Sequence, residues 1–299
     1  MLSDDLINLK YFSDKSGIPS EVLSEMYAVE KNFFDKISNE SDFNIRQGLY
    51  SFVYTKSAEL LEPYSKNYFE VLVKAKCKIL NIFKKDVVGK SILDIGSGSG
   101  AFLYAIAKSG LPYKSLYGLD VKAPVLPNDS FSKEVKCFQR NVVDFELPEK
   151  FEVAILDNVY EHISLADKHL FLSSISNSLE IGGRLILIIP NRLFGPTDWT
   201  ILKDNTHRGK TKANCLHLDE TTFKEVIETL KNYGFSNFVS PVPFIVLSKL
   251  NQIFPNFRLP SVIYSFIENS GFIRIFKNVK FKGKSIMRME VSIIAEKIK

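Results

Sequence analysis

The sequence predicts an α/β protein built on a mostly parallel sheet, and three observations carry this prediction. Short apolar strands alternate with helices from Gly89 onward, a pattern typical of parallel α/β sheets. A glycine-rich loop at residues 96–100 directly follows the first of these strands. Acidic residues stand just beyond the ends of successive strands, at the edge where open α/β sheets bind ligands. We therefore expect a small-molecule site at that edge.

Residues 1–88 precede the alternation and are predicted to form a helical N-terminal cap. Ser20 is expected to be the N-cap of one helix, Pro63 breaks a second segment, and a third helix with one apolar stripe is expected over 68–83. The region contains no motif of recognisable chemistry.

The core is predicted over residues 89–240, where helices connect successive strands. Ser164 and Asp167 are expected to begin one helix that a glycine pair at 182–183 ends, and Asp219 is expected to cap another that Gly234 ends. The strands are expected at 91–95, 115–119, 135–139, 151–156, 184–189 and 235–239.

An insertion, residues 241–284, interrupts the alternation before a final strand within 285–299. The insertion is rich in proline and aromatic residues, so we expect short helices and not one continuous helix. We predict that they cover the substrate at the carboxyl edge of the sheet. Four lysines are expected at the entrance: Lys277, Lys280, Lys282 and Lys284.

Composition and charge limit the class of protein. The 299 residues are 45% hydrophobic and 24% charged, as in ordinary globular proteins, with no apolar run near the roughly 18 residues of a membrane-spanning helix. Three scattered cysteines form no disulfide framework, so we expect a cytoplasmic protein. From residue 241 onward ten Lys or Arg face three Glu, a charge of +7. This basic region either meets an anionic substrate, a membrane surface or RNA, or is simply a solvated face.

The glycine loop and its acids predict the kind of ligand. Gly96, Gly98 and Gly100 allow positive φ and close approach of a ligand to the backbone, but they also satisfy the dinucleotide fingerprint. Asp120, at the end of the next strand, would accept the ribose hydroxyls of a dinucleotide or of a ligand with a sulfonium group alike. Asp94 distinguishes these two kinds of ligand, because its carboxylate would repel the diphosphate of a dinucleotide and suits a sulfonium and an ammonium group.

Taken in order, these segments resemble class I S-adenosylmethionine-dependent methyltransferases. Leu-Asp-Ile-Gly-Ser-Gly-Ser-Gly at 93–100 is similar to motif I of that family, Gly-Leu-Asp at 118–120 to the second motif, and Asn-Val-Val-Asp at 141–144 to the third. The segments 157–163 and 182–191 resemble the ubiquinone-biosynthesis-like branch.

The resemblance implies a Rossmann-like sheet of seven strands with the last strand antiparallel, and S-adenosylmethionine as the cofactor. In this arrangement Asp144 would accept a hydrogen bond from the adenine amino group. The cofactor-binding residues are expected to be Asp94, Gly96, Ser97, Gly98, Gly100, Asp120, Asp144 and Asn158.

The catalytic candidates are His162, Glu161 and His217. An oxygen nucleophile needs its proton removed, and we expect His162 as a general base or substrate positioner. Some relatives bind a divalent metal through a Glu-x-x-Glu-His motif and a later His. In this sequence Glu161 and His162 match the end of that motif and His217 matches the later His, but Asn158 stands in place of the first Glu. We therefore assign no metal, and metal dependence remains an alternative, as does a purely structural role of Glu161 and His162. Trp199 either stacks on substrate or packs beneath its loop.

The predicted activity is methyl transfer to an oxygen of a small molecule, or of a glycan or lipid-linked intermediate. The alternative is an RNA methyltransferase that uses the basic C-terminal region, although no RNA-binding module is recognisable, so we do not expect a nucleic-acid acceptor. A peripheral contact with a membrane is left open. A non-enzymatic binding protein and a NAD-dependent oxidoreductase rank behind these.

Overall fold

The structure is a computed structural model of the chain. It describes residues 6–64, 68–124, 126–203, 212–243, 248–254, 256–271, 273, 279–281, 284–285 and 289–299.

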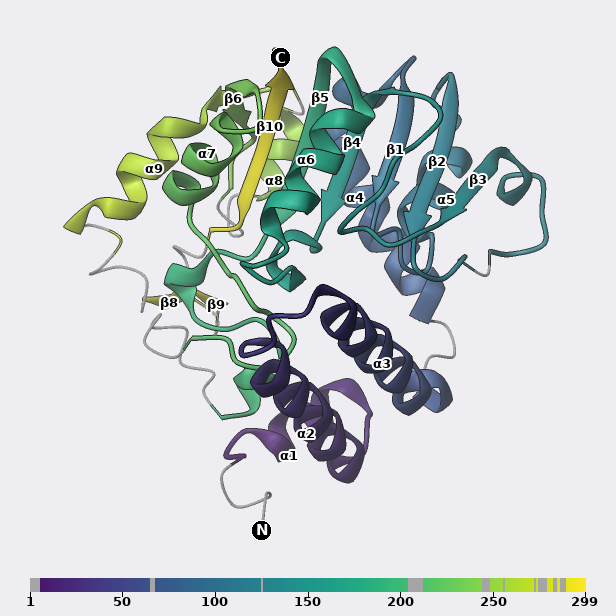
Figure 1. Ribbon diagram of the computed structural model, residues 1–299. Helices are drawn as coiled ribbons and strands as arrows, with labels where there is room; N and C mark the ends of the chain where they lie inside the picture. Colours follow the sequence, from purple (N-terminus) through teal and green to yellow (C-terminus); the bar gives the residue numbers. More distant parts are fainter. Residues whose placement is uncertain are drawn as a thin grey trace.

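One mixed sheet forms the centre of the molecule, with strand order β3-β2-β1-β4-β5-β10-β6-β7 (Figure 1). The strands β1 to β5 are parallel, and β10 is antiparallel to both of its neighbours. The expected Rossmann-like sheet with an antiparallel last strand is confirmed, and the two-residue edge strand β7 is an eighth strand beyond the seven expected. The strands of this sheet are β1 (Ser91–Ile95), β2 (Ser115–Asp120), β3 (Val135–Gln139), β4 (Phe151–Asp157), β5 (Leu179–Ile189), β6 (Phe235–Ser240), β7 (Leu259–Pro260) and β10 (Val291–Lys297).

Helices cover both faces of the sheet, because alternate side chains of each buried strand point to opposite sides. On one face Ile92 and Ile155 pack against α4 and α5. On the other face Leu93 and Leu156 pack against α6 and α7. The helices of the chain are α1 (Leu9–Ser16), α2 (Ser20–Ile37), α3 (Phe43–Leu61), α4 (Tyr68–Val87), α5 (Ala101–Lys108), α6 (Lys168–Ser178), α7 (Phe223–Lys231), α8 (Ser248–Ile253) and α9 (Ser261–Asn269).

Helices α1, α2 and α3 lie beneath the carboxyl edge of the parallel strands (Figure 1). The predicted helical segment therefore stands where a ligand of this sheet would bind. Helix α4 departs from this arrangement, because it packs against α5 as part of the core layer. The division of the chain at residue 88 stays a prediction.

The described part of the insertion contains the short helices that we expected. Helix α9 packs against α7 and β6, at the opposite end of the sheet from the glycine loop (Figure 1). A two-stranded ribbon, β8 (Lys280–Phe281) with β9 (Lys284–Ser285), follows. The side chains of the four expected entrance lysines lie outside the described residues. A substrate-covering role of the insertion therefore stays a prediction.

Three local expectations were wrong. Asp219 does not cap α7; it forms an ion pair with Lys168 at 3.0 Å, and Thr222 caps the helix in a capping box. The glycine pair at 182–183 lies within β5 instead of ending α6. Ser20 is the first residue of α2 and gives no side-chain cap.

In the part of the chain that the structure describes, no helix is both long and apolar enough to cross a membrane.

Candidate functional site

The glycine loop after β1 takes a shape that only glycine tolerates well. Gly96, Gly98 and Gly100 have φ of 72°, 53° and 74°, in the left-handed region that other residues rarely adopt. A Cβ on Gly96 would lie 2.5 Å from a methyl carbon of Val159, so this glycine is also required for space. The backbone N–H groups of Gly96 and Ser97 donate to the Leu119 carbonyl at 2.8 and 3.2 Å, which fixes the loop to β2.

Asp94 is buried at the end of β1. Burial, helped by the neighbouring Asp157, raises the pKa of the Asp94 carboxyl to about 8, although the Lys76 ammonium opposes this rise. Lys76 comes from α4 and forms an ion pair with Asp157 at 2.6 Å. Asp94 therefore stays protonated near neutral pH until a further positive charge approaches it.

Asp120 joins the end of β2 to the glycine loop. Its Oδ2 accepts a hydrogen bond from the Gly98 N–H at 2.8 Å, and its Oδ1 accepts one from Lys122 N–H at 3.3 Å. Nearby, the buried hydroxyl of Ser97 has no hydrogen-bond partner among the described residues. The carboxylate of Asp120 beside the loop is a suitable partner for ribose hydroxyls.

Asn158 and Asp144 occupy different settings. Asn158 follows β4 with a φ of 57°, a strained conformation for a residue other than glycine. Its backbone N–H donates to the Ile188 carbonyl at 2.9 Å and its side-chain amide donates to Asp157 at 2.9 Å. Asp144 lies in the bend after β3 and is exposed. Its expected contact with adenine stays a prediction.

Glu161, His162 and His217, the three catalytic candidates, lie together. One potential ligand atom from each residue lies within 4.8 Å of those of the other two. The two imidazole centroids are 4.7 Å apart with the rings nearly perpendicular. Glu161 is completely buried, and neither of its carboxylate oxygens has a hydrogen-bond partner among the described residues. In the sequence His217 is 55 residues from His162 and 56 from Glu161, so the fold brings it to them.

Each imidazole is held through its Nδ1 atom. The Nδ1 of His162 lies 3.3 Å from the Leu216 carbonyl oxygen, which can only accept, so this nitrogen donates. The Nδ1 of His217 lies 2.7 Å from the Glu220 carboxylate, and Glu220 also accepts from the Thr197 hydroxyl at 2.9 Å. In a neutral imidazole these contacts leave the lone pair on Nε2.

The charges of the cluster depend on one another. Burial and the nearby His217 lower the pKa of His162 well below its usual value, so this ring is neutral. Burial also lowers the pKa of His217, but the hydrogen bond with Glu220 and the charge of Glu161 outweigh it and raise this pKa to about 9. Burial raises the pKa of Glu161 to about 7, and His217 opposes that rise.

A pocket of about 380 Å³ opens beside the cluster at the ends of β4 and β5. Its walls include His217 and Thr197 from the region between β5 and α7, and Asn158 from the loop after β4. Asn191 also lines it, and its side-chain amide donates to the buried Glu268 of α9 at 2.5 Å. The pocket therefore borders the cluster through His217 and the turn that follows β4 through Asn158.

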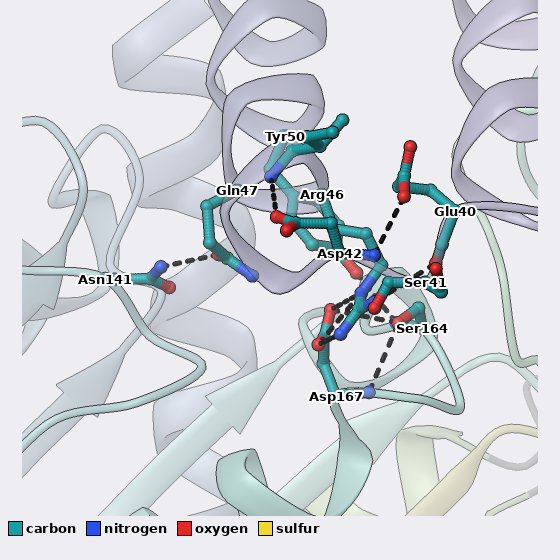
Figure 2. Close-up of polar contacts among 10 residues, drawn as sticks. Glu40, Ser41, Asp42, Arg46, Gln47, Tyr50, Asn141, Ser164 and Asp167 are labelled. Atoms are coloured by element: carbon teal, nitrogen blue, oxygen red, sulfur yellow. Dashed lines mark hydrogen bonds and ion pairs between the residues drawn. The ribbon is translucent and has the colours of Figure 1, made fainter.

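Helix α3 is fastened to this edge by buried polar contacts (Figure 2). Arg46 makes a bidentate ion pair with Asp167 before α6, with its Nε 3.0 Å from both carboxylate oxygens. The Tyr50 hydroxyl accepts from the Ser164 N–H at 2.8 Å. Gln47 accepts from Asn141, in the segment after β3, at 2.5 Å. The helix therefore spans the loops after β3 and β4.

Sequence reasoning missed the contributions of the helical segment to the site. Tyr54 of α3 packs edge-on against the ring of His162, with centroids 6.2 Å apart, and Lys76 of α4 lines the pocket. Neither lies in a motif, so only the fold shows them. Of the two alternatives for Trp199, the structure supports packing, because its ring contacts the apolar cluster of Leu23 and Tyr27.

The strand order and the glycine loop define the class of protein. The antiparallel β10 between β5 and β6, with a glycine turn after β1 and an acid ending β2, is the arrangement that we expected of a methyltransferase. The sequence model of a family described as a methyltransferase domain matches residues 67–238. Because this match covers more than half of the chain, the chain belongs to the methyltransferase domain family, in which S-adenosylmethionine is the methyl donor.

Two solved structures illustrate more distant similarity. The 1,6-didemethyltoxoflavin-N1-methyltransferase of Burkholderia thailandensis, with 1,6-didemethyltoxoflavin and S-adenosylhomocysteine bound, is 13% identical with a TM-score of 0.44, over 82% of this chain and 90% of that one. Human N-acetylserotonin methyltransferase in complex with S-adenosylmethionine is 15% identical with a TM-score of 0.46, over 81% of this chain and 58% of that one. Among curated proteins the comparison finds no match.

Proposed function

We propose that this chain binds S-adenosylmethionine at the glycine loop and transfers its methyl group to an oxygen of an acceptor held in the adjoining pocket. The observation that carries this proposal is the pairing of two carboxyls, Asp94 and Asp120, with a glycine turn. This setting suits a ligand with sulfonium and ammonium groups and disfavours the diphosphate of a dinucleotide. Asp94 would face the charged methionine end and Asp120 the ribose.

The acceptor is proposed to be a small molecule, or a sugar or lipid-linked intermediate with a reactive hydroxyl. When bound, the cofactor supplies an electrophilic methyl group on a positively charged sulfur. The protein then needs to place the acceptor oxygen in line with that carbon and to promote loss of its proton. The pocket supplies the placement, and we assign the activation to the cluster of Glu161, His162 and His217.

The RNA alternative is not proposed. It rested on the basic C-terminal region, and the lysine side chains expected at the entrance lie outside the described residues. The pocket beside the cluster is a concavity of about 380 Å³, a size typical of sites for small molecules.

Binding of S-adenosylhomocysteine, measured by titration calorimetry with NADH as the competing candidate, tests this assignment. Asp120→Ala should weaken S-adenosylhomocysteine binding by about 1.5–3 kcal/mol, because buried ribose hydroxyls lose a charged acceptor. Asp120→Asn is the matched control: it keeps an acceptor for the Gly98 N–H and should weaken binding less. Tight binding of NADH without binding of S-adenosylhomocysteine would overturn the assignment.

A further inference from the structure

The outward face of α9 is mainly apolar, whereas its inward face is mainly polar. The exposed positions of the helix are Val262, Ile263, Phe266 and Asn269, and Phe266 is 73% exposed. These positions lie on one side of the helix, because residues three and four apart are neighbours there. A surface helix usually has the reverse arrangement, with its apolar side toward the core. The outward face of α9 therefore has the character of a contact surface.

Specific polar contacts fix the inward face of α9. The buried Glu268 carboxylate accepts hydrogen bonds from the Phe223 N–H at 3.0 Å and from the Asn191 side-chain amide at 2.5 Å. At the start of the helix the buried hydroxyls of Ser261 and Ser240 are 2.7 Å apart. A rotation that turned the apolar side inward would leave these buried groups without partners, which is costly. The apolar face is therefore held outward by the fold.

The chain that leads to α9 exposes further large apolar side chains. Leu250 and Ile253 of α8 are exposed, and so are Phe254 and Phe257 after it, with Phe254 exposed by 59%. The Phe257 N–H donates to the Phe254 carbonyl at 3.0 Å, so the backbones of these two residues are held together. A single exposed apolar residue is ordinary. Their concentration within residues 250–266, together with the face of α9, indicates an interaction surface.

Positive charge accompanies these apolar side chains. A hollow of about 390 Å³ has three basic and two acidic side chains among its walls, namely Lys85, Arg184, Arg258, Asp86 and Glu296. Asp86 accepts from Arg184 at 2.9 Å and from Arg258 at 3.0 Å, and Lys85 is exposed. From residue 241 onward the sequence carries ten Lys or Arg and three Glu, a charge of +7. An anionic surface would attract this part of the molecule.

We propose that residues 250–266 bind the surface of an anionic phospholipid membrane, with their exposed apolar side chains at the boundary between headgroups and acyl chains. Apolar side chains flanked by Lys and Arg bind membranes in this way. Helix α9 is the outermost helix at its end of the molecule (Figure 1), so a flat surface can approach it. A second copy of the chain fits less well, because a symmetric pair brings the same two faces together and with them two basic regions that repel each other.

Co-sedimentation of the full chain with phospholipid vesicles tests the proposal. The chain should bind vesicles that contain phosphatidylglycerol more tightly than vesicles of phosphatidylcholine alone, and binding should weaken as salt screens the charges. Phe266→Asn should lower the affinity by about tenfold or more, because a large apolar side chain no longer leaves water. Phe52→Asn is the matched control, since Phe52 is exposed on α3, and it should bind as the wild-type chain does. Absence of binding to phosphatidylglycerol vesicles, or equal binding by Phe266→Asn, would overturn the proposal.

Two further measurements distinguish a lipid surface from a second copy and from a folding defect. Lys85→Glu should weaken binding to phosphatidylglycerol vesicles, whereas Lys133→Glu, exposed beside β3 at the other end of the sheet, should not. Sedimentation equilibrium without vesicles should give the same molecular mass for the wild-type chain and Phe266→Asn. A dimer that Phe266→Asn dissociates, without vesicle binding by the wild-type chain, would assign the face to a second copy. Membrane binding through these residues is independent of methyl transfer, so Phe266→Asn should bind S-adenosylhomocysteine and unfold on heating as the wild-type chain does.

Discussion

At the scale of single residues, Asp94 links cofactor binding to pH. Its carboxyl lies near Asp157 of β4, Asp120 of β2 and Lys76 of α4, and burial is the main reason that its pKa rises from 3.8 to about 8. The raised pKa means that the folded chain binds this proton more tightly than the unfolded chain does. The contribution of Asp94 to the free energy of unfolding therefore falls as the pH rises from about 4 toward 8.

A cationic ligand beside Asp94 should reverse this preference, because a nearby positive charge favours the ionised carboxyl. Binding of S-adenosylmethionine at pH 7 should therefore release close to one proton, and its affinity should increase with pH up to about 8. Calorimetry in two buffers of different ionisation enthalpy measures the release. Asp94→Asn should abolish it, whereas the exposed Asp144→Asn should not. Equal proton release by the wild-type chain and Asp94→Asn would contradict this role.

Residues of the glycine loop could be predicted from the sequence, because the turn directly follows an apolar strand along the chain. Gly96 has the positive φ that its place in the loop predicted, whereas the contact of Asp120 with ribose stays a prediction. The environment of Glu161 could not be predicted. Glu161 is buried where the chain around His217 approaches it, as the hydrogen bonds from Leu218 and Asp219 N–H to its backbone carbonyl show, and these residues meet only in the folded molecule.

At the scale of elements, helix α3 connects the N-terminal segment to the site. Its bidentate pair of Arg46 with Asp167 is almost completely buried (Figure 2). Arg46→Ala would leave Asp167 as an unpaired buried charge, so the free energy of unfolding should fall by about 3–5 kcal/mol. Urea unfolding measures the change. The double variant Arg46→Leu, Asp167→Leu is the control and should regain most of the loss, because neither charge is then buried alone. A loss below about 1 kcal/mol for the single variant would show that the pair does not hold the helix.

The elements themselves were largely predictable where apolar periodicity decides them. The strands β1 and β3 begin and end at the expected residues. Helix starts were less predictable, since several acids and hydroxyls compete to cap a helix. Thr222 caps α7 because Glu225 completes its capping box, whereas Asp219 is occupied by Lys168. Such tertiary partners leave no local pattern in the sequence.

At the scale of the whole molecule, segments that precede and follow the core in the sequence add side chains to the site. Tyr54 reaches the site from the N-terminal helices, and Glu268 of the insertion holds Asn191 at the pocket. Burial, with hydrogen bonds from Phe223 and Asn191 opposing it, raises the pKa of Glu268 to about 7. The order of motifs along the sequence predicted the core and its cofactor. It did not predict which side chains from outside the core would complete the acceptor side, because these contacts join residues far apart in the sequence.

The central claim, methyl transfer to an acceptor other than RNA, is tested most directly with S-adenosylmethionine that carries a deuterated methyl group. The full chain is incubated with separated small-molecule, glycan, lipid and RNA fractions, and mass spectrometry follows the label. Label is expected in a small-molecule, glycan or lipid product. His162→Ala should lower the rate by on the order of a hundredfold while S-adenosylhomocysteine affinity changes little, and His169→Ala should leave the rate unchanged. Label found in RNA alone, or an equal rate with His162→Ala, would contradict the account.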